Sequence, residues 1–313
     1  MNKFQKLTNA FKNYYGEDAI KRLLLNSNNS NKPIILIGGH QLTGKSTMAK
    51  KISQHFQDGC FYSVGSMFRD LATSLNISVA EQSRLLREIE EYHKQPNNNN
   101  SILSGQRIKN NPLFNIKVDL ELDYRTCQII QGVESTTPTT TPHSKYSVIE
   151  GRQPALLGCF IQSLTNNNNN NNDANHNNQM IKVYVKCSAR EKALRYLERE
   201  VGKGASILAD SVLPKEKDLE RDDHFSSTNL STIANTISKL PLENIDKIIS
   251  GFIENQDRDQ NDRKRYMDIY GLDYEDKDYY DLVIDTTGDT SENNLKKALD
   301  FINHLKIKDL IKK

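Results

Sequence analysis

The chain has 313 residues, of which 36% are hydrophobic and 26% charged, and its formal net charge is +2. A net charge so near zero argues against nucleic acid or an anionic membrane as partner, because neither would be attracted over a distance. No apolar run approaches the roughly 20 residues that a membrane-spanning helix needs. The four cysteines include no Cys-x-x-Cys pair, which favours reduced thiols over a metal site or disulfides.

The first 32 residues combine basic side chains with Phe4, Leu7 and Phe11. This mixture is compatible with a transit peptide, which leaves a mitochondrial location open, but Glu17 and Asp18 argue against it because transit peptides contain few acidic residues. We expect a leader helix, frayed or docked on the rest of the chain, in a cytoplasmic monomer.

Three segments rich in asparagine or threonine, near residues 96–101, 135–145 and 165–179, have no hydrophobic period. They cannot bury enough apolar surface to fold, so we expect solvated insertions in surface loops. The cost of closing a loop rises slowly with its length, and the insertions are therefore compatible with one domain over residues 33–313.

From residue 33 onward apolar strands alternate with helices, which predicts an α/β fold of three layers, with a central parallel sheet between helices. The expected strands are residues 33–37, 60–64, 146–150, 181–187 and 281–286. Helices are expected over residues 45–56 and 291–307, and after capping boxes at Ser78 and Ser188. The connections near residues 76–131 and 202–278 are long for this fold class, and long excursions of this kind carry substrate-binding and lid segments.

A glycine-rich loop, Gly39–Ser46, joins the first expected strand to the first expected helix. Glycines at its two ends allow backbone N–H groups to point at phosphate oxygens, Lys45 would reach the β- and γ-phosphates, and the Ser46 hydroxyl would bind Mg²⁺. The predicted ATP-binding residues are Gly39, His40, Gln41, Leu42, Thr43, Gly44, Lys45, Ser46 and Thr47. A chance match to so short a pattern is disfavoured because strand, loop and helix occur in the required order.

Two arginines follow the ends of expected strands. Arg69 comes after the second strand, and Arg152 comes directly after the third. Both ends lie on the edge of the sheet that carries the glycine-rich loop, and guanidinium groups bind phosphate through paired hydrogen bonds. Either arginine alone could be a surface ion-pair residue, but together they predict a second anionic group opposite ATP.

The stretch Arg263-Lys264-Arg265-Tyr266-Met267-Asp268-Ile269-Tyr270-Gly271-Leu272-Asp273 is followed by Tyr280-Asp281-Leu282-Val283-Ile284-Asp285-Thr286. Apart from Leu272 in place of isoleucine, it matches the pattern RKRYxxxYGID…YDLVIDT, and Phe68-Arg69-Asp70-Leu71-Ala72 matches FRxLA. Both patterns are typical of cytidylate kinases, so the chain resembles the archaeal-type, cytidylate-kinase-like branch of the P-loop nucleoside monophosphate kinases. The resemblance covers most of the chain outside the leader and the insertions, although that branch often has threonine where this chain has Lys45.

The resemblance implies a monophosphate-binding region near residues 65–131 and a lid near residues 195–266. In the family, arginines at the positions of Arg69 and Arg152 hold the monophosphate, and a D-x-R pattern fits Asp123 and Arg125. The implied CMP-binding residues are thus Arg69, Arg152, Asp123 and Arg125, and the lid arginines fall on Arg195, Arg199, Arg258 and Arg265.

Helical spacing supports part of this lid. Arg258, Asp262 and Arg265 share one helix face, so Asp262 could hold both arginines toward the phosphates; a solvated face with ion pairs is the alternative. Arg195 could instead pair with Glu191 one turn earlier. The predicted catalytic residues are Lys45, Arg195, Arg199, Arg258, Asp262 and Arg265.

The implied reaction is transfer of the γ-phosphoryl group of MgATP to CMP or dCMP, with Mg²⁺ as cofactor. The acceptor is already an anionic oxygen, so positioning and charge neutralisation would supply the catalysis. No residue for choosing the base is identified, which leaves another monophosphate or small acceptor open. A nucleotide-hydrolysing switch is disfavoured because the third strand ends at Glu150 rather than aspartate, and a protein that only binds nucleotide is disfavoured because Lys45 and Ser46 are both present.

Overall fold

The protein is described here by a computed structural model that covers residues 3–25, 33–56, 59–94, 117–132, 146–168, 180–219 and 227–305. Five strands in these ranges form one sheet in the order β2-β3-β1-β4-β5, and every neighbouring pair is parallel. The strands are β1 (Ile34–Gly38), β2 (Gly59–Ser63), β3 (Tyr146–Glu150), β4 (Met180–Lys186) and β5 (Leu282–Asp285). The prediction of an α/β fold with a central parallel sheet is confirmed.

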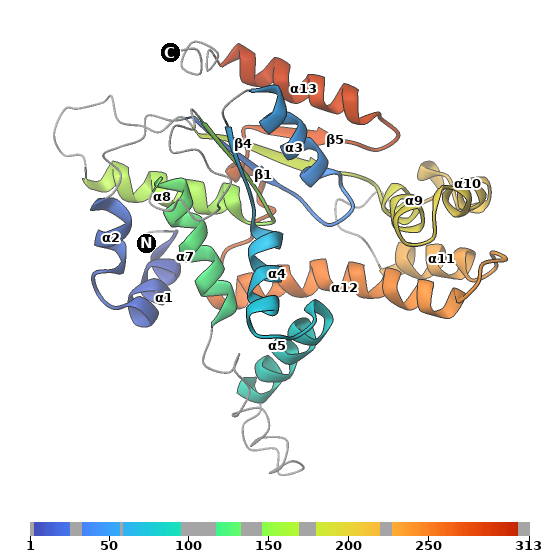
Figure 1. The fold of residues 1–313 in the computed structure, drawn as a ribbon, viewed down its shortest axis with the longest axis horizontal. Helices are drawn as coiled ribbons and strands as arrows, with labels where there is room; N and C mark the ends of the chain where they lie inside the picture. The colour runs from blue at the N-terminus through green and yellow to red at the C-terminus, as the bar shows by residue number, and fades with distance from the viewer. Residues whose placement is uncertain are drawn as a thin grey trace.

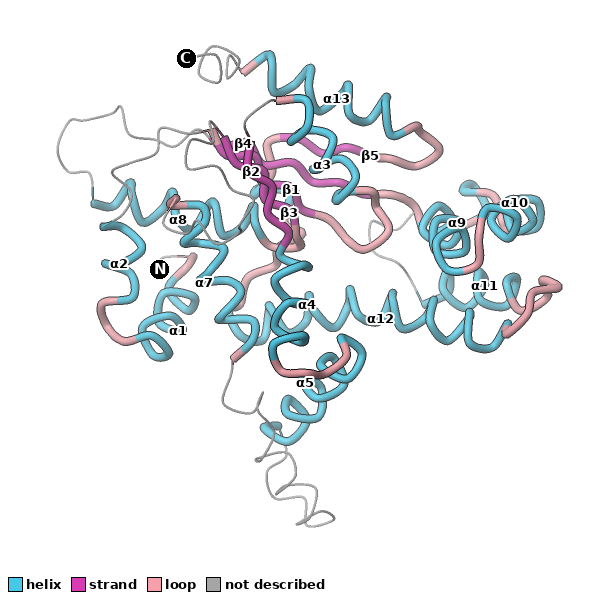
Figure 2. Tube along the Cα trace, in the orientation of Figure 1, coloured by secondary structure: helices cyan, strands magenta, loops and turns pink. Residues whose placement is uncertain are grey.

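Helices cover both faces of the sheet (Figure 1). One face carries α3 (Lys45–His55) and α13 (Ser291–His304), and the other carries α4 (Val64–Ser74), α7 (Val118–Ile130) and α8 (Pro154–Asn168). Because side chains alternate along a strand, Ile35 and Ile37 of β1 pack in the apolar cluster on the first face. Ile34 and Leu36 pack in the cluster on the second face. The tube view in Figure 2 shows the strands enclosed between these helices.

The N-terminal segment forms two helices, α1 (Gln5–Tyr15) and α2 (Ala19–Leu25). Leu7, Phe11 and Leu23 are buried in the same cluster as α7 and α8. The Phe11 ring lies edge-on to Tyr124 with centroids 5.2 Å apart. Of the two forms expected for the leader, the structure shows the docked one.

Four helices form a group that begins on the right in Figure 1, although the last of them extends leftward below the sheet. They are α9 (Ala189–Glu200), α10 (Lys203–Val212), α11 (Ser227–Ile237) and α12 (Ile245–Tyr270). Leu197, Ile233 and Phe252 belong to a third apolar cluster, which joins α9, α11 and α12. The long helix α12 then runs back past α4 to α1, with which it is in contact. The remaining described elements are α5 (Val79–Lys94) and two 3₁₀ turns, Glu216–Asp218 and Lys277–Tyr279.

Both predicted helix starts have the serine cap, but the Ser188 backbone N–H donates to the Thr287 hydroxyl at 2.9 Å, where a complete capping box would have Glu191 as the acceptor. The Ser188 Oγ accepts a hydrogen bond from the Glu191 backbone N–H at 3.1 Å, and the Ser78 Oγ accepts one from the Glu81 N–H at the same distance. The predicted insertions lie outside the described residues, except for residues 165–168, which complete α8. Within the described ranges no helix is both long and apolar enough to cross a membrane.

Candidate active site

A cavity of about 1010 Å³ opens where the glycine-rich loop meets the ends of β2 and β3. Residues of α4, α5, α7 and α12 complete its walls, and its volume is at the upper end of the usual range for small-molecule sites. Its basic lining residues are Lys45, Lys50, Arg69, Arg84, Arg152, Arg199, Arg258 and Arg265, and its acidic ones are Glu81, Asp119, Glu150, Glu254 and Asp262. With eight basic and five acidic side chains, the cavity suits a large anionic ligand.

The glycine-rich loop has the conformation that its glycines allow. Gly44 has φ +88°, in the left-handed region, where it precedes the first residue of α3. A Cβ on Gly39 would lie 2.3 Å from the Val185 carbonyl oxygen, so only glycine lets the loop pass this close to β4. Lys45 lines the cavity and its Nζ donates to the His40 carbonyl oxygen at 3.1 Å. Burial lowers the pKa of Lys45, while the nearby Glu150 opposes this effect.

Several predicted ATP-binding side chains point elsewhere. The His40 Nε2 contacts the Glu275 carboxylate, and the His40 Nδ1 lies 3.1 Å from the Lys192 Nζ. Thr43 is buried and its hydroxyl donates to the His40 carbonyl oxygen at 2.9 Å. Thr47 is exposed and is not part of the cavity lining. The loop therefore offers backbone N–H groups, Lys45 and Ser46, rather than all of its side chains.

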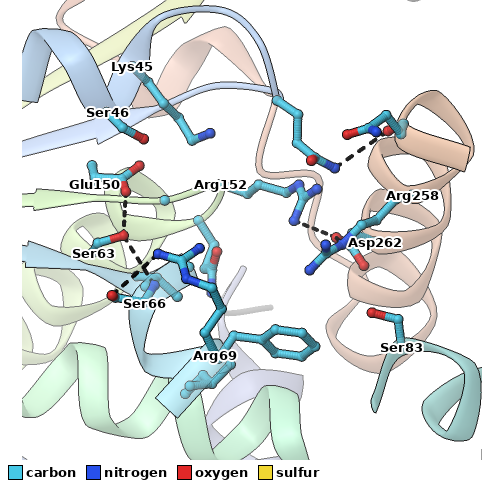
Figure 3. A pocket seen from close by; sticks show the side chains of 18 of the residues that line it. Lys45, Ser46, Ser63, Ser66, Arg69, Ser83, Glu150, Arg152, Arg258 and Asp262 are labelled. Carbon is cyan, nitrogen blue, oxygen red and sulfur yellow. Dashed lines mark hydrogen bonds and ion pairs between the residues drawn. The ribbon is translucent and has the colours of Figure 1, made fainter. Parts of the chain in front are cut away.

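Glu150, at the end of β3, is a cavity residue that the sequence reasoning missed. It is buried, and its Oε1 accepts a hydrogen bond from the Ser63 hydroxyl at 2.5 Å. Figure 3 shows Glu150 and Ser46 on the same side of the cavity as Lys45. The described residues hold no cluster of three or more His, Cys, Asp or Glu side chains suited to a metal. Mg²⁺ bound with phosphates needs only one or two protein oxygens, and the Ser46 hydroxyl and Glu150 carboxylate are of this kind.

Arg152 is held from α12 by two carboxylates. Its Nη1 lies 2.5 Å from Asp262, and its Nε and Nη2 donate to Asp259 at 3.1 and 2.7 Å. Burial alone would lower the pKa of Arg152, but Asp262 and Asp259 raise it above its ordinary value. The arginine is therefore charged and oriented at the cavity wall.

Asp262 also bridges to the two lid arginines that the sequence predicted. Its Oδ1 accepts from the Arg265 Nη2 at 2.8 Å, and its Oδ2 lies 4.0 Å from the Arg258 Nε. Arg265 has a second carboxylate partner in Asp119 of α7, at 2.6 and 3.0 Å, which sequence spacing could not identify. The predicted role of Asp262 as a bridge agrees with this geometry, and Figure 3 shows Arg258 and Asp262 facing Arg152.

Arg69 lies on the α4 side of the cavity, and its Nη2 donates to the Ser66 Oγ at 3.3 Å. The neighbouring Phe68 ring packs under Arg258, with 5.2 Å between the guanidinium carbon and the ring centroid. The structure thus brings Arg69, Arg152, Arg258 and Arg265 to one cavity, although they come from widely separated parts of the chain.

Two predicted arginines differ in their placement. Arg199 lines the cavity and pairs with the adjacent Glu200 at 2.7 Å. Arg195 does not line it: its Nε donates to Glu191, and its two terminal nitrogens donate to the Leu42 carbonyl oxygen and to Thr286. Arg195 thus ties the glycine-rich loop to the end of β5 and forms the pair with Glu191 that was the alternative interpretation.

The predicted D-x-R pair also lies outside the cavity lining. Asp123 is fully buried, and it accepts hydrogen bonds from Gln153 Nε2 at 2.9 Å and from the Tyr270 hydroxyl at 2.8 Å. Burial, with a smaller effect of Asp119, raises the pKa of Asp123 to about 7. The structure therefore places Asp123 in the interior and Arg125 outside the cavity lining. Gln153, which does line the cavity, is the residue that Asp123 orients.

Comparison with known proteins adds a short sequence match. No family model matches the chain. A cytidylate kinase from Thermococcus kodakarensis (strain ATCC BAA-918 / JCM 12380 / KOD1) is 49% identical over 35 residues, which are 11% of this chain and 18% of that protein. A solved structure of an uncharacterized protein from Eubacterium ventriosum ATCC 27560 superposes with a TM-score of 0.37 and 14% identity, over 87% of this chain and 99% of its own. That superposition is too loose to establish a shared fold.

Proposed function

We propose that the chain is a P-loop nucleoside monophosphate kinase that transfers the γ-phosphoryl group of MgATP to CMP or dCMP. One observation carries the proposal: a single cavity is lined both by the glycine-rich loop, with Lys45 and Ser46, and by arginines that other elements contribute. A protein that only bound a nucleotide at this loop would need one anion-binding site. Arg69 and Arg152, beyond the ends of β2 and β3, supply a second one in the same space.

The residues around the cavity have distinct tasks in this reaction. Lys45 and the loop N–H groups bind the donor phosphates, and Arg69 and Arg152 orient the acceptor phosphate. Arg258 and Arg265, held by Asp262, neutralise the charge that spreads over the transferred oxygens. Mg²⁺, bound through Ser46 and Glu150, would supply further charge neutralisation. The acceptor oxygen is already anionic, so no side chain has to remove a proton.

Gln153 favours a base that carries an exocyclic amine. Its Nε2 donates to Asp123, so the amide oxygen Oε1 is directed away from that carboxylate. An amide oxygen accepts but cannot donate, which suits the amino group of cytosine better than the carbonyl oxygen of uracil. The 35-residue similarity to a cytidylate kinase points in the same direction.

ADP formation from MgATP, measured separately with CMP, dCMP, UMP, AMP and GMP, tests the proposal. We expect turnover with CMP or dCMP and only weak activity with UMP. Lys45→Ala should remove this turnover, whereas Lys51→Ala, on the same helix but outside the cavity lining and paired with Glu292, should retain it. Activity with a different acceptor alone would reject the cytidine assignment. ATP hydrolysis that no acceptor accelerates, or equal rates for Lys45→Ala and wild type, would reject the kinase.

A further inference from the structure

Asp259 on α12 has an unusual set of partners. Its carboxylate accepts hydrogen bonds from the Gln41 backbone N–H at 3.1 and 3.3 Å and from Arg152 at 2.7 and 3.1 Å. The side chain is 3% exposed. A loop N–H and a guanidinium group are the donors that bind phosphate oxygens elsewhere, and here both are occupied by a carboxylate of the same chain.

The carboxylate is ionised. Burial alone would raise the pKa of Asp259, but Arg152, His40 and Lys192 lower it to about 2. It therefore carries a full negative charge at neutral pH, beside the loop that is proposed to bind the phosphates of ATP.

Other contacts hold α12 in this position. The Gln41 Nε2 donates to the Asn255 carbonyl oxygen at 3.5 Å, and the Tyr274 hydroxyl donates to the backbone oxygen of Asp259 at 3.3 Å. The helix thus lies against the glycine-rich loop, and Asp262 on the same helix holds Arg152 from its other end.

We propose that Asp259 is an internal competitor of the ATP phosphates: it occupies the Gln41 N–H until MgATP displaces it, and its displacement then frees Arg152 for the acceptor phosphate. The inference rests on the proposed kinase function. A phosphate of MgATP and the Asp259 carboxylate compete for the Gln41 N–H, so nucleotide binding has to draw Asp259 away. Because Arg258, Asp262 and Arg265 lie on the same helix, this displacement also moves the groups that neutralise the transferred phosphoryl group. Asp259 is thus a positioning residue that couples occupation of the glycine-rich loop to the placement of α12.

Calorimetric titration of wild type, Asp259→Asn and the control Asp257→Asn tests the competition. Two probes are titrated into each protein: a non-hydrolysable MgATP analogue and inorganic tripolyphosphate. Asp257 is an exposed residue of the same helix outside the cavity, so its variant changes the charge without touching the loop. Since like charges brought together cost several kcal/mol, we expect Asp259→Asn to bind both probes at least ~10-fold more tightly, and Asp257→Asn to bind like wild type. Loss of a merely structural contact would weaken binding, so the direction of the change separates the two roles.

Asp259→Ala provides a second variant if the asparagine disturbs folding, which circular dichroism will show, and it should also bind more tightly. Equal or weaker binding by folded Asp259 variants overturns the inference. If wild type transfers phosphate in the acceptor experiment while the variants bind no more tightly, the kinase proposal stands and the competition falls. If neither wild type nor the variants bind either probe, both the kinase proposal and the competition are rejected.

Discussion

Replacing Asp262 by alanine removes the carboxylate shared by three arginines. Arg152 and Arg265 contact it at 2.5 and 2.8 Å, and Arg258 lies 4.0 Å away. Because all three arginines line the cavity, we expect the change to affect both the stability of the fold and the rate of the proposed phosphoryl transfer.

The structure sets the size of both effects. Removing one partner of a buried ion pair costs about 3–5 kcal/mol, but Asp262 is 15% exposed, and Arg152 and Arg265 keep Asp259 and Asp119 as partners. We therefore expect the free energy of unfolding to fall by about 2 kcal/mol, which is below that range. Loss of a preorganised charge-stabilising arrangement should lower kcat by roughly 10²-fold. The KM for MgATP should change little, because Asp262 does not contact the glycine-rich loop.

Urea unfolding followed by circular dichroism measures the first effect, and steady-state ADP formation with saturating CMP measures the second. Asp257→Ala, which removes an exposed carboxylate from the same helix, is the matched control and should resemble wild type in both. A folded Asp262→Ala protein with the kcat of wild type would refute the idea that this bridge positions the arginines for transfer.

Three further changes probe other parts of the molecule. The folded-state pKa of Asp123, about 7, lies above its ordinary value of 3.8. The free energy of unfolding should therefore fall by up to about 1.4 kcal/mol per pH unit as pH rises between these two values. Asp123→Asn should remove this fall in urea titrations at pH 4.5, 6 and 7.5, and an unchanged pH dependence of the unfolding free energy would contradict the assignment. Leu7→Ala, in a fully buried position of α1, should lower the free energy of unfolding by about 2–5 kcal/mol, whereas a loss below about 0.5 kcal/mol, typical of surface positions, would mean that α1 does not dock. Glu150→Gln should raise the Mg²⁺ concentration needed for half-maximal turnover roughly 10-fold, and an unchanged Mg²⁺ dependence would remove Glu150 from the metal site.

The sequence by itself determined the α/β architecture, because its signals are local. A strand buried on both faces is a continuous apolar run, as in Ile34–Gly38. A capping side chain marks the start of a helix, as at Ser188. The glycine-rich loop is also local, since strand, turn glycines and helix follow each other directly. Arg69 and Arg152 could be placed near this loop because the ends of parallel strands share one edge of the sheet.

Only the tertiary structure decided which side chains face the cavity and which brace it. Asp259 contacts Arg152 and Gln41, which lie 107 and 218 positions away, and no periodic pattern along α12 could predict that a carboxylate on its buried face is paired rather than solvated. Tertiary packing likewise determines that Arg195 donates to Thr286 and that Asp123 accepts from Gln153 in the protein interior. A charged side chain is buried only where the fold supplies its partner, and here those partners come from other segments of the chain.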